Sequence, residues 1–299
     1  MRRQVQSYKK SDPKTKHQKA IPPEVYRFIL RRAKHPRARA RAELLCGNLF
    51  FASRSCEYSK TQRHKEKRTR TVRPCDVTFR DSDGSIIPHS HPRLHEAQYV
   101  IVTFGPQKSD AHRDETVPQE RTNDPELNPV WHWAYTIRRL QSYPDYDPKW
   151  PIYTYYDSGK KRFSDIRSYE VLDDICAAVT AIGVAVLGFT ADDVGTHSNR
   201  GGFAMMMYLA GVPVFTIMKM GRWLSDAFLN YIEKQILTFS EGISKKMIAS
   251  NTFFNFPVNK KLHKKKDPKT RSIGHYRHPA KDKVFGRNKS FRDHFKLPI

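Results

Sequence analysis

Apolar residues recur at intervals of three and four along most of the chain, which is the spacing of an amphipathic helix. The segments with this spacing are 21–33, 41–58, 128–143, 168–184, 196–211, 213–223, 225–237 and 240–250. Pro22 and Pro23 open the first of them and Pro213 opens another, where a missing amide donor costs little, and Gly211 is predicted to end a third. The pattern predicts a largely helical protein.

Three segments instead alternate between apolar and polar residues and are rich in Val, Ile, Thr and aromatic residues, as strands are. They are 70–80, 97–110 and the short segment 114–119. Pro106 and the polar residues after it predict a turn between the second and third strands. The aromatic, Pro-rich segment 144–166 is expected to be a loop. The predicted fold class is therefore α+β, mostly helical, with one small three-stranded antiparallel sheet.

The charge is concentrated at the two ends of the chain. The 54 Lys and Arg residues against 30 Asp and Glu give a net charge of +24. Residues 1–20 contribute +6 and residues 259–299 contribute +11, so we predict a folded domain over 21–257 between basic, disordered tails at 1–20 and 258–299. A chain this basic is most simply a partner of a polyanion, and nucleic acid is the commonest one.

Several other classes of protein are disfavoured by the composition. The four cysteines form no metal-binding or disulfide pattern, which fits a reducing compartment. The histidines of the stretch 89–95 lie in a Pro-containing segment and favour a solvated loop over a metal site. Apolar runs stay below the ~18 residues of a membrane span, and no cleavable signal peptide opens the chain. The Lys-rich stretch 260–269 fits a nuclear address, a phosphate-binding tail, or both.

Two short stretches carry the most specific pattern. Residues 194–202 read VGTHSNRGG, and residues 221–231 read GRWLSDAFLNY. The order His-x-x-Arg, a helix ending in Ala-Gly-Val, Gly-x-Trp and then Tyr resembles the tyrosine recombinases of the phage-integrase type, with the integrase-like proteins of eukaryotic mobile elements as the most similar group. The resemblance covers roughly residues 21–257. The spacing from Trp223 to Tyr231 is one residue shorter than is usual in bacterial members.

The resemblance implies a catalytic set. Its members would be Arg54, Lys108, His197, Arg200, Trp223 and Tyr231, with Glu57 in support of Arg54. Two guanidiniums offer paired donors to the oxygens of a phosphodiester, and a tyrosine can form a covalent phosphotyrosine. His197 would take the proton of Tyr231, Lys108 would protonate the leaving oxygen, and Trp223 would donate an indole N–H to a phosphate oxygen.

Each of these residues also has a plainer interpretation. Arg54 alone fits a surface or ion-paired arginine, and His197 alone fits a helix cap or a core histidine. Lys65 and Lys67 are rivals of Lys108, and Tyr208 is a rival of Tyr231. The adjacent glycines at 201 and 202, next to a helix start, predict the close approach of another backbone, either protein or DNA.

The function that follows from the resemblance is DNA breakage and rejoining through a 3′-phosphotyrosyl intermediate, with no metal, no ATP and no other cofactor. The expected partners are double-stranded DNA and further copies of the chain, with no membrane involved, and the expected location is the nucleus. Only about twenty residues precede the first helix, so the upstream domain that completes the DNA clamp in the family is not expected here. The alternatives are a non-catalytic DNA-binding relic or domesticated protein that retains the fold, and a basic RNA-binding protein.

Overall fold

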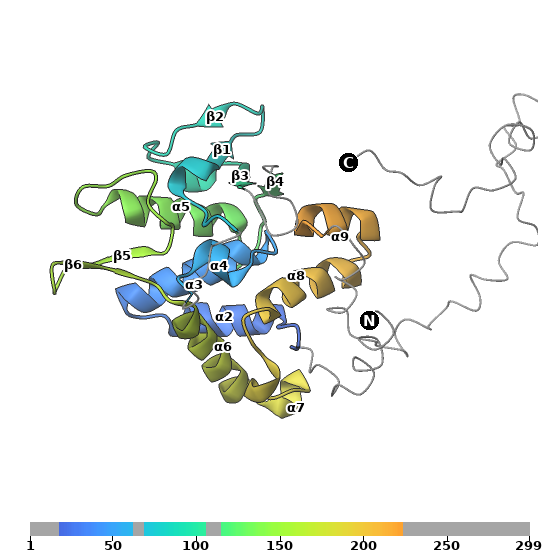
Figure 1. Ribbon diagram of the computed structural model, residues 1–299. Coiled ribbons are helices and arrows are strands. Elements are labelled where there is room, and N and C mark those ends of the chain that lie inside the picture. The colour runs from blue at the N-terminus through green and yellow to red at the C-terminus, as the bar shows by residue number, and fades with distance from the viewer. Residues whose placement is uncertain (1–17, 62–68, 106–114, 224–299) are drawn as a thin grey trace, which may run out of the picture. The chain divides into compact units, whose positions relative to one another are not determined.

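A computed structural model describes residues 18–61, 69–105 and 115–223 of the chain (Figure 1). Lys108, Tyr231, the rival lysines 65 and 67 and the helices predicted over 225–237 and 240–250 lie outside these residues. The predicted tails lie outside them as well, except for residues 18–20, where the Lys19 amide donates to the Asp193 carbonyl at 2.8 Å.

Four helices surround the main core. They are α2 (Pro23–Arg32), α3 (Pro36–Leu49), α5 (Pro129–Gln141) and α6 (Ser168–Ile182). Prolines at the first position of α2, α3 and α5 give up amides that a helix start leaves unpaired anyway. Trp133 of α5 is 1% exposed and donates its indole N–H to the Gly47 carbonyl of α3 at 3.2 Å, so these two helices pack closely. No helix in the described part of the chain is both long and apolar enough to cross a membrane.

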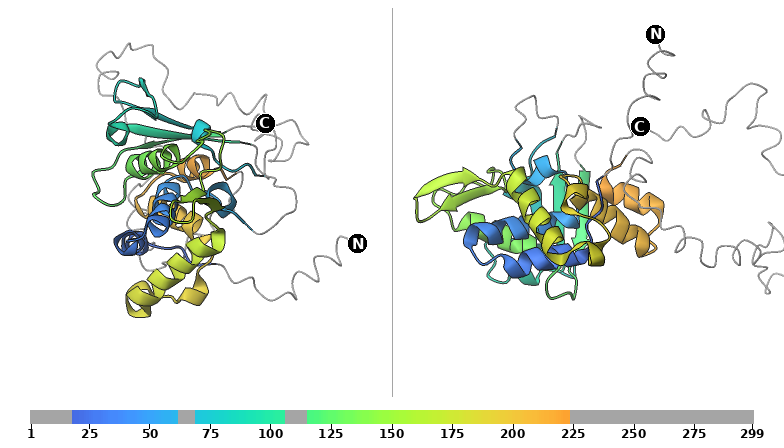
Figure 2. Two further views of the ribbon diagram at one scale, coloured as in Figure 1. Left: turned by 90° about the vertical axis from the view of Figure 1, so that its left-hand side faces the viewer. Right: turned by 90° about the horizontal axis from the view of Figure 1, so that it is seen from below.

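The sheet lies against α5 and contains the three predicted strands (Figures 1 and 2). Its strands are β1 (Val77–Arg80), β2 (Ile86–Ile87), β3 (Tyr99–Phe104) and β4 (Glu115–Glu120), in the antiparallel order β2-β1-β3-β4. Alternate residues of β3 are buried, as expected for a sheet with one face on the core. The α+β fold class is confirmed, and β2 adds a short edge strand to the predicted sheet.

The helix predicted over 41–58 is broken, which corrects the sequence analysis. The chain leaves α3 after Leu49, turns at Ala52 in the left-handed region with φ of 47°, and re-enters a helix at α4 (Ser55–Tyr58). The carbonyls of Phe51 and Ala52 accept hydrogen bonds from distant arginine side chains, so they are not available to continue the helix.

The loop predicted over 144–166 also differs, because it contains a two-stranded hairpin. Strands β5 (Thr154–Asp157) and β6 (Arg162–Asp165) pair in antiparallel register, with Tyr156 opposite Phe163. Aromatic pairs across neighbouring strands stabilise a sheet. The aromatic residues that made this segment resemble a loop therefore hold the hairpin together.

The last described elements lead to the candidate site. They are α7 (Val184–Leu187), α8 (Ser198–Leu209) and α9 (Val214–Gly221); three short 3₁₀ turns lie at Pro74–Asp76, Leu94–Glu96 and Ala191–Asp193. Gly211 has φ of 73° just after α8, as predicted for a helix end. A Cβ at Gly202 would lie 2.7 Å from the Ile21 carbonyl oxygen, so the predicted close approach of a backbone is confirmed, and that backbone is the protein's own.

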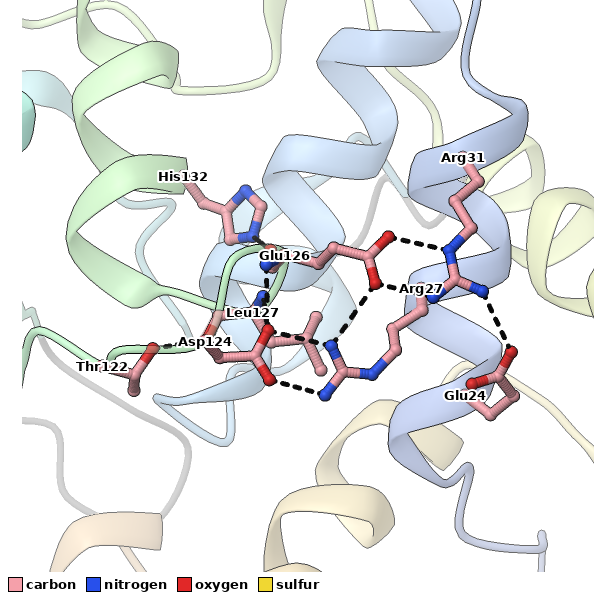
Figure 3. Close-up of polar contacts among 8 residues, drawn as sticks. All are labelled: Glu24, Arg27, Arg31, Thr122, Asp124, Glu126, Leu127 and His132. Carbon is pink, nitrogen blue, oxygen red and sulfur yellow. Dashed lines mark hydrogen bonds and ion pairs between the residues drawn. The ribbon is translucent and has the colours of Figure 1, made fainter.

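A network of ion pairs joins α2 to the segment before α5 (Figure 3). Arg27 donates two hydrogen bonds to the carboxylate of Asp124, at 2.8 and 2.6 Å, and Arg31 donates two to Glu126, both at 2.8 Å. The hydrogen bond from Arg27 holds the pKa of Asp124 well below its ordinary value. The network fixes α2 against the core on its solvent side.

His132 gives the fold a predicted pH dependence. Burial lowers its pKa to about 4, and its Nε2 lies 2.8 Å from the Glu126 carbonyl oxygen. Between pH ~6.5 and ~4 the unfolded chain binds a proton that the folded chain rejects, so this histidine should lower the free energy of unfolding by up to ~3 kcal/mol as the pH falls through that window. Urea unfolding at several pH values should show a weaker pH dependence for His132→Gln. An equal dependence in the two proteins would contradict this assignment.

Candidate active site

The turn after α3 places Arg54 at the start of α4, with Glu57 directly beneath it. The backbone N–H of Arg54 donates to Glu57 Oε2 at 2.7 Å, and its Nη1 donates to Glu57 Oε1 at 3.2 Å. The Glu57 side chain is fully buried, whereas that of Arg54 is 22% exposed. Two hydrogen bonds from Arg54 to Glu57 therefore hold a side chain that stays partly exposed. The catalytic role that the resemblance implies for Arg54 stays a prediction.

A second arginine, which the sequence analysis did not single out, reaches the same carboxylate. Arg222 follows α9 with φ of 58°, and its side chain is fully buried. Its Nη1 and Nη2 donate to the two oxygens of Glu57, each at 2.9 Å, and its guanidinium carbon lies 3.5 Å from the centre of the Phe104 ring. Burial alone would raise the pKa of Glu57, but Arg222 and then Arg54 outweigh it and hold that pKa below its ordinary value.

Arg200 lies in the first turn of α8 and is almost fully buried. Its Nη1 donates to the Ala52 carbonyl at 2.7 Å, and its Nη2 donates to the Gly221 carbonyl at 2.6 Å. The Trp223 ring centre lies 4.3 Å from its guanidinium carbon, a cation–π contact. Arg200 thus connects the turn after α3 to the end of α9 and is fixed in direction by both. Trp223 therefore packs against the guanidinium of Arg200. Its predicted contact with a phosphate stays a prediction.

His197 directly precedes α8, three residues before Arg200, and the charges of Arg200 and Arg54 act on its side chain. Its backbone N–H donates to Gln18 Oε1 at 2.8 Å. Burial, and after it the positive charges of Arg200 and Arg54, lower the pKa of the His197 side chain. The imidazole is therefore neutral at pH 7, which is the form that accepts a proton.

Five of the residues implied by the resemblance thus converge on the turn at 50–53. They are Arg54, Glu57, His197, Arg200 and Trp223, and the structure adds Arg222 to them. With His197 neutral, the three guanidiniums and the single carboxylate leave a net charge of +2. Such a site is suited to the negative charge that develops on the oxygens of a phosphodiester when one of its bonds breaks.

The remaining two predicted residues, Lys108 and Tyr231, lie outside the described residues. Strand β3, which precedes Lys108 in the sequence, ends at Phe104 against the buried Arg222. Trp223, eight residues before Tyr231, is the last described residue. Among the residues that the structure describes, no group of three or more His, Cys, Asp or Glu side chains is placed to hold a metal ion.

The signal that would have found Arg222 was present in the sequence but ambiguous. Arg222 stands between Gly221 and Trp223 in the motif. The sequence alone does not distinguish a buried arginine at this position from the many solvated arginines of the chain. The helix break after Leu49 gave the Arg222 side chain two carbonyl acceptors, and that break was not predicted.

The sequence matches no known family model and no curated protein. Among solved structures, the chain is similar to the XerH site-specific recombinase bound to its difH substrate, with 13% identity over 75% of this chain and 53% of that one and a TM-score of 0.46. It is also similar to the Tn1549 transposon integrase in complex with circular intermediate DNA, with 11% identity over 80% of this chain and 68% of that one and a TM-score of 0.43.

These neighbours are a recombinase and an integrase. The link to eukaryotic mobile elements stays a prediction. The chain spans about half the length of the XerH chain that it matches.

Proposed function

We propose that the protein is a DNA breaking-and-joining enzyme of the tyrosine recombinase type, which cuts and rejoins DNA through a 3′-phosphotyrosyl intermediate. The observation that carries the proposal is that Arg200 donates to the Ala52 carbonyl at 2.7 Å, two residues before Arg54, although the two arginines lie far apart in the sequence. The charges of both arginines act on the same imidazole. That arrangement is expected where two fixed cations share one anionic substrate group.

In the proposed reaction, Arg54 and Arg200 donate to the non-bridging oxygens of one phosphate. The phenol oxygen of Tyr231 attacks the phosphorus, its proton passes to His197, and the bond to the 5′ oxygen breaks. Lys108 supplies the proton that this leaving oxygen takes up. The phosphorus exchanges its bond to the 5′ oxygen for a bond to the Tyr231 oxygen and stays attached to the 3′ oxygen of the DNA throughout, so rejoining needs no ATP and no metal. DNA and a multimer of the chain are the proposed partners, and the nucleus is the proposed location.

The proposal is tested by trapping the covalent intermediate. Target sites should first be selected from random duplexes, because the sequence does not state the target. A duplex nicked just beside the cut site loses a short fragment on cleavage, which prevents rejoining. The wild-type chain, in buffer with EDTA and without ATP, should then form a protein–DNA adduct that survives denaturing gel electrophoresis.

Two tyrosine variants distinguish chemistry from mere binding. Tyr231→Phe should bind the duplex but form no adduct, because it lacks the phenol oxygen. Tyr208→Phe is the matched control, on α8, and should form adduct like the wild type. An adduct that persists in Tyr231→Phe would contradict the assigned nucleophile. Salt-sensitive binding with no adduct from the wild-type chain would favour a non-catalytic DNA-binding protein.

A further inference from the structure

An open pocket of about 790 Å³ lies between the β5–β6 hairpin and the start of α6, apart from the candidate active site. Five cationic side chains line it. They are Arg37, Lys60, Lys160, Arg162 and Arg167. The function proposed above assigns no role to any of them.

Two of these cations are already neutralised. Arg37 donates two hydrogen bonds to the carboxylate of Glu170, both at 2.9 Å, and the Lys60 ammonium lies 3.3 Å from Asp165. Three acidic residues line the pocket, and two of them are taken up by these ion pairs. The third is Asp157, whose carboxylate accepts a hydrogen bond from the backbone N–H of Lys160 at 3.1 Å.

The other three cations carry the pocket's excess charge. Within the described ranges, the side chains of Lys160, Arg162 and Arg167 form no ion pair, and all three residues are exposed. Set against Asp157, they leave the pocket with a net charge of +2. An anion that enters the pocket can therefore bind these three cations without first breaking an ion pair.

The hairpin that carries Lys160 and Arg162 is held rigid by aromatic contacts. The Phe163 ring lies 4.9 Å from the ring of Tyr156 and 5.1 Å from the ring of Trp150, centre to centre. A lone two-stranded hairpin is marginally stable in water, and such contacts stabilise it. Because the hairpin is ordered before binding, its cations lose less entropy when they engage an anion.

The pocket is tied to the active site by a short, fixed connection. Lys60 lies six residues after Arg54, and its backbone N–H and C=O bond to Ile166 and Ser168, both at 2.9 Å. One helical turn plus two extended residues span at most ~13 Å along the backbone from Arg54 to Lys60. α4 lies between the hairpin and α9 in Figure 1 and in the right-hand view of Figure 2. DNA rises 3.4 Å per nucleotide of each strand, so ~13 Å corresponds to about four nucleotides.

We propose that this hairpin pocket binds backbone phosphates of DNA within about four nucleotides of the bond that is cut. The inference rests on the proposed function for its partner and for the position of the cut. It adds a second anchoring point on the duplex, which fixes the phosphate of the cut bond against Arg54 and Arg200. Such contacts set position and add affinity without reading the base sequence.

The test compares two charge-removing double variants of the full chain. K160Q/R162Q removes two exposed cations of the pocket, and K34Q/K149Q removes two exposed lysines that do not line it. Fluorescence anisotropy gives Kd for one duplex at several salt concentrations. Each lost phosphate contact should lower the slope of log K against log salt by ~0.9, so K160Q/R162Q should lose ~1.8 in slope and bind ~30-fold more weakly at 0.15 M salt.

A chemical substitution in the DNA locates the contact. Neutral methylphosphonates placed up to about four nucleotides from the cut should weaken binding of the wild-type chain and of K34Q/K149Q, and should have little further effect on K160Q/R162Q. A slope for K160Q/R162Q equal to that of the control would overturn the inference, whether or not the wild-type chain forms an adduct. If the wild-type chain forms no adduct, the cleavage proposal is contradicted instead. The comparison of salt slopes then still tests whether the pocket binds DNA phosphates.

Discussion

Replacing Arg222 with methionine is expected to lower the free energy of unfolding by about 3–5 kcal/mol. Arg222 and Glu57 are both fully buried, and two hydrogen bonds of 2.9 Å join them. Methionine fills much of the same volume but leaves the carboxylate with only the partly exposed Arg54 as a cationic partner. The fold must then keep a buried charge that is poorly compensated, or take up a proton there. Urea unfolding monitored by fluorescence measures the loss.

The double variant Glu57→Gln/Arg222→Met separates the loss of the ion pair from a simple packing defect. Removing both charges leaves no ion behind, so the double variant should be more stable than Arg222→Met alone, although it carries one more substitution. A loss below ~1 kcal/mol in the single variant, or a double variant that is less stable than the single one, would contradict the role assigned to this ion pair.

Replacing Arg54 with alanine is expected to slow adduct formation by about 10²–10³-fold, the usual cost of removing one fixed donor from a developing negative charge. The effect on folding should be small, because the Arg54 side chain is partly exposed and Glu57 keeps its bonds to Arg222. The measurement is the single-turnover rate of adduct formation on a nicked duplex at saturating protein.

Arg73→Ala provides a matched control for Arg54→Ala. Arg73 also precedes a short helical turn, donates its backbone N–H to an acid three residues later at 2.9 Å and forms an ion pair with that acid, Asp76. Arg73 lies outside the candidate site, so the rate of adduct formation by Arg73→Ala should stay near that of the wild type. Equal losses in the two variants would show that Arg54 acts only through the local fold.

The order of motifs in the sequence was enough to name residues that the structure brings together. It did not predict the course of the backbone around them. His197, Arg200 and Trp223 belong to one local stretch, so helical spacing and the turn predicted at Gly211 were enough to bring them together. Arg54 meets them only because the chain breaks after Leu49. The apolar run 41–58 favours one helix, whereas the guanidinium donors that bind the backbone carbonyls of the turn come from side chains 148 and 171 residues further along.

Burial and pairing of charge were the features that the sequence could not supply. Arg222 looks like any other arginine of a basic chain, and only tertiary contact shows that it is fully buried against Glu57. The hairpin at 154–165 was missed for a related reason. Its aromatic residues indicated a loop when taken singly, whereas their pairing across the strands depends on tertiary packing.

The measurement that tests the central claim most directly replaces the phosphate at the cut position with a neutral methylphosphonate. If Arg54 stabilises the negative charge of that phosphate, its guanidinium matters far less once one charged oxygen has become a methyl group. The deficit of Arg54→Ala relative to the wild type should then shrink from about 10²–10³-fold on the phosphodiester to below ~10-fold on the methylphosphonate. An equal deficit on both substrates would contradict the claim that Arg54 binds the phosphate that is cut.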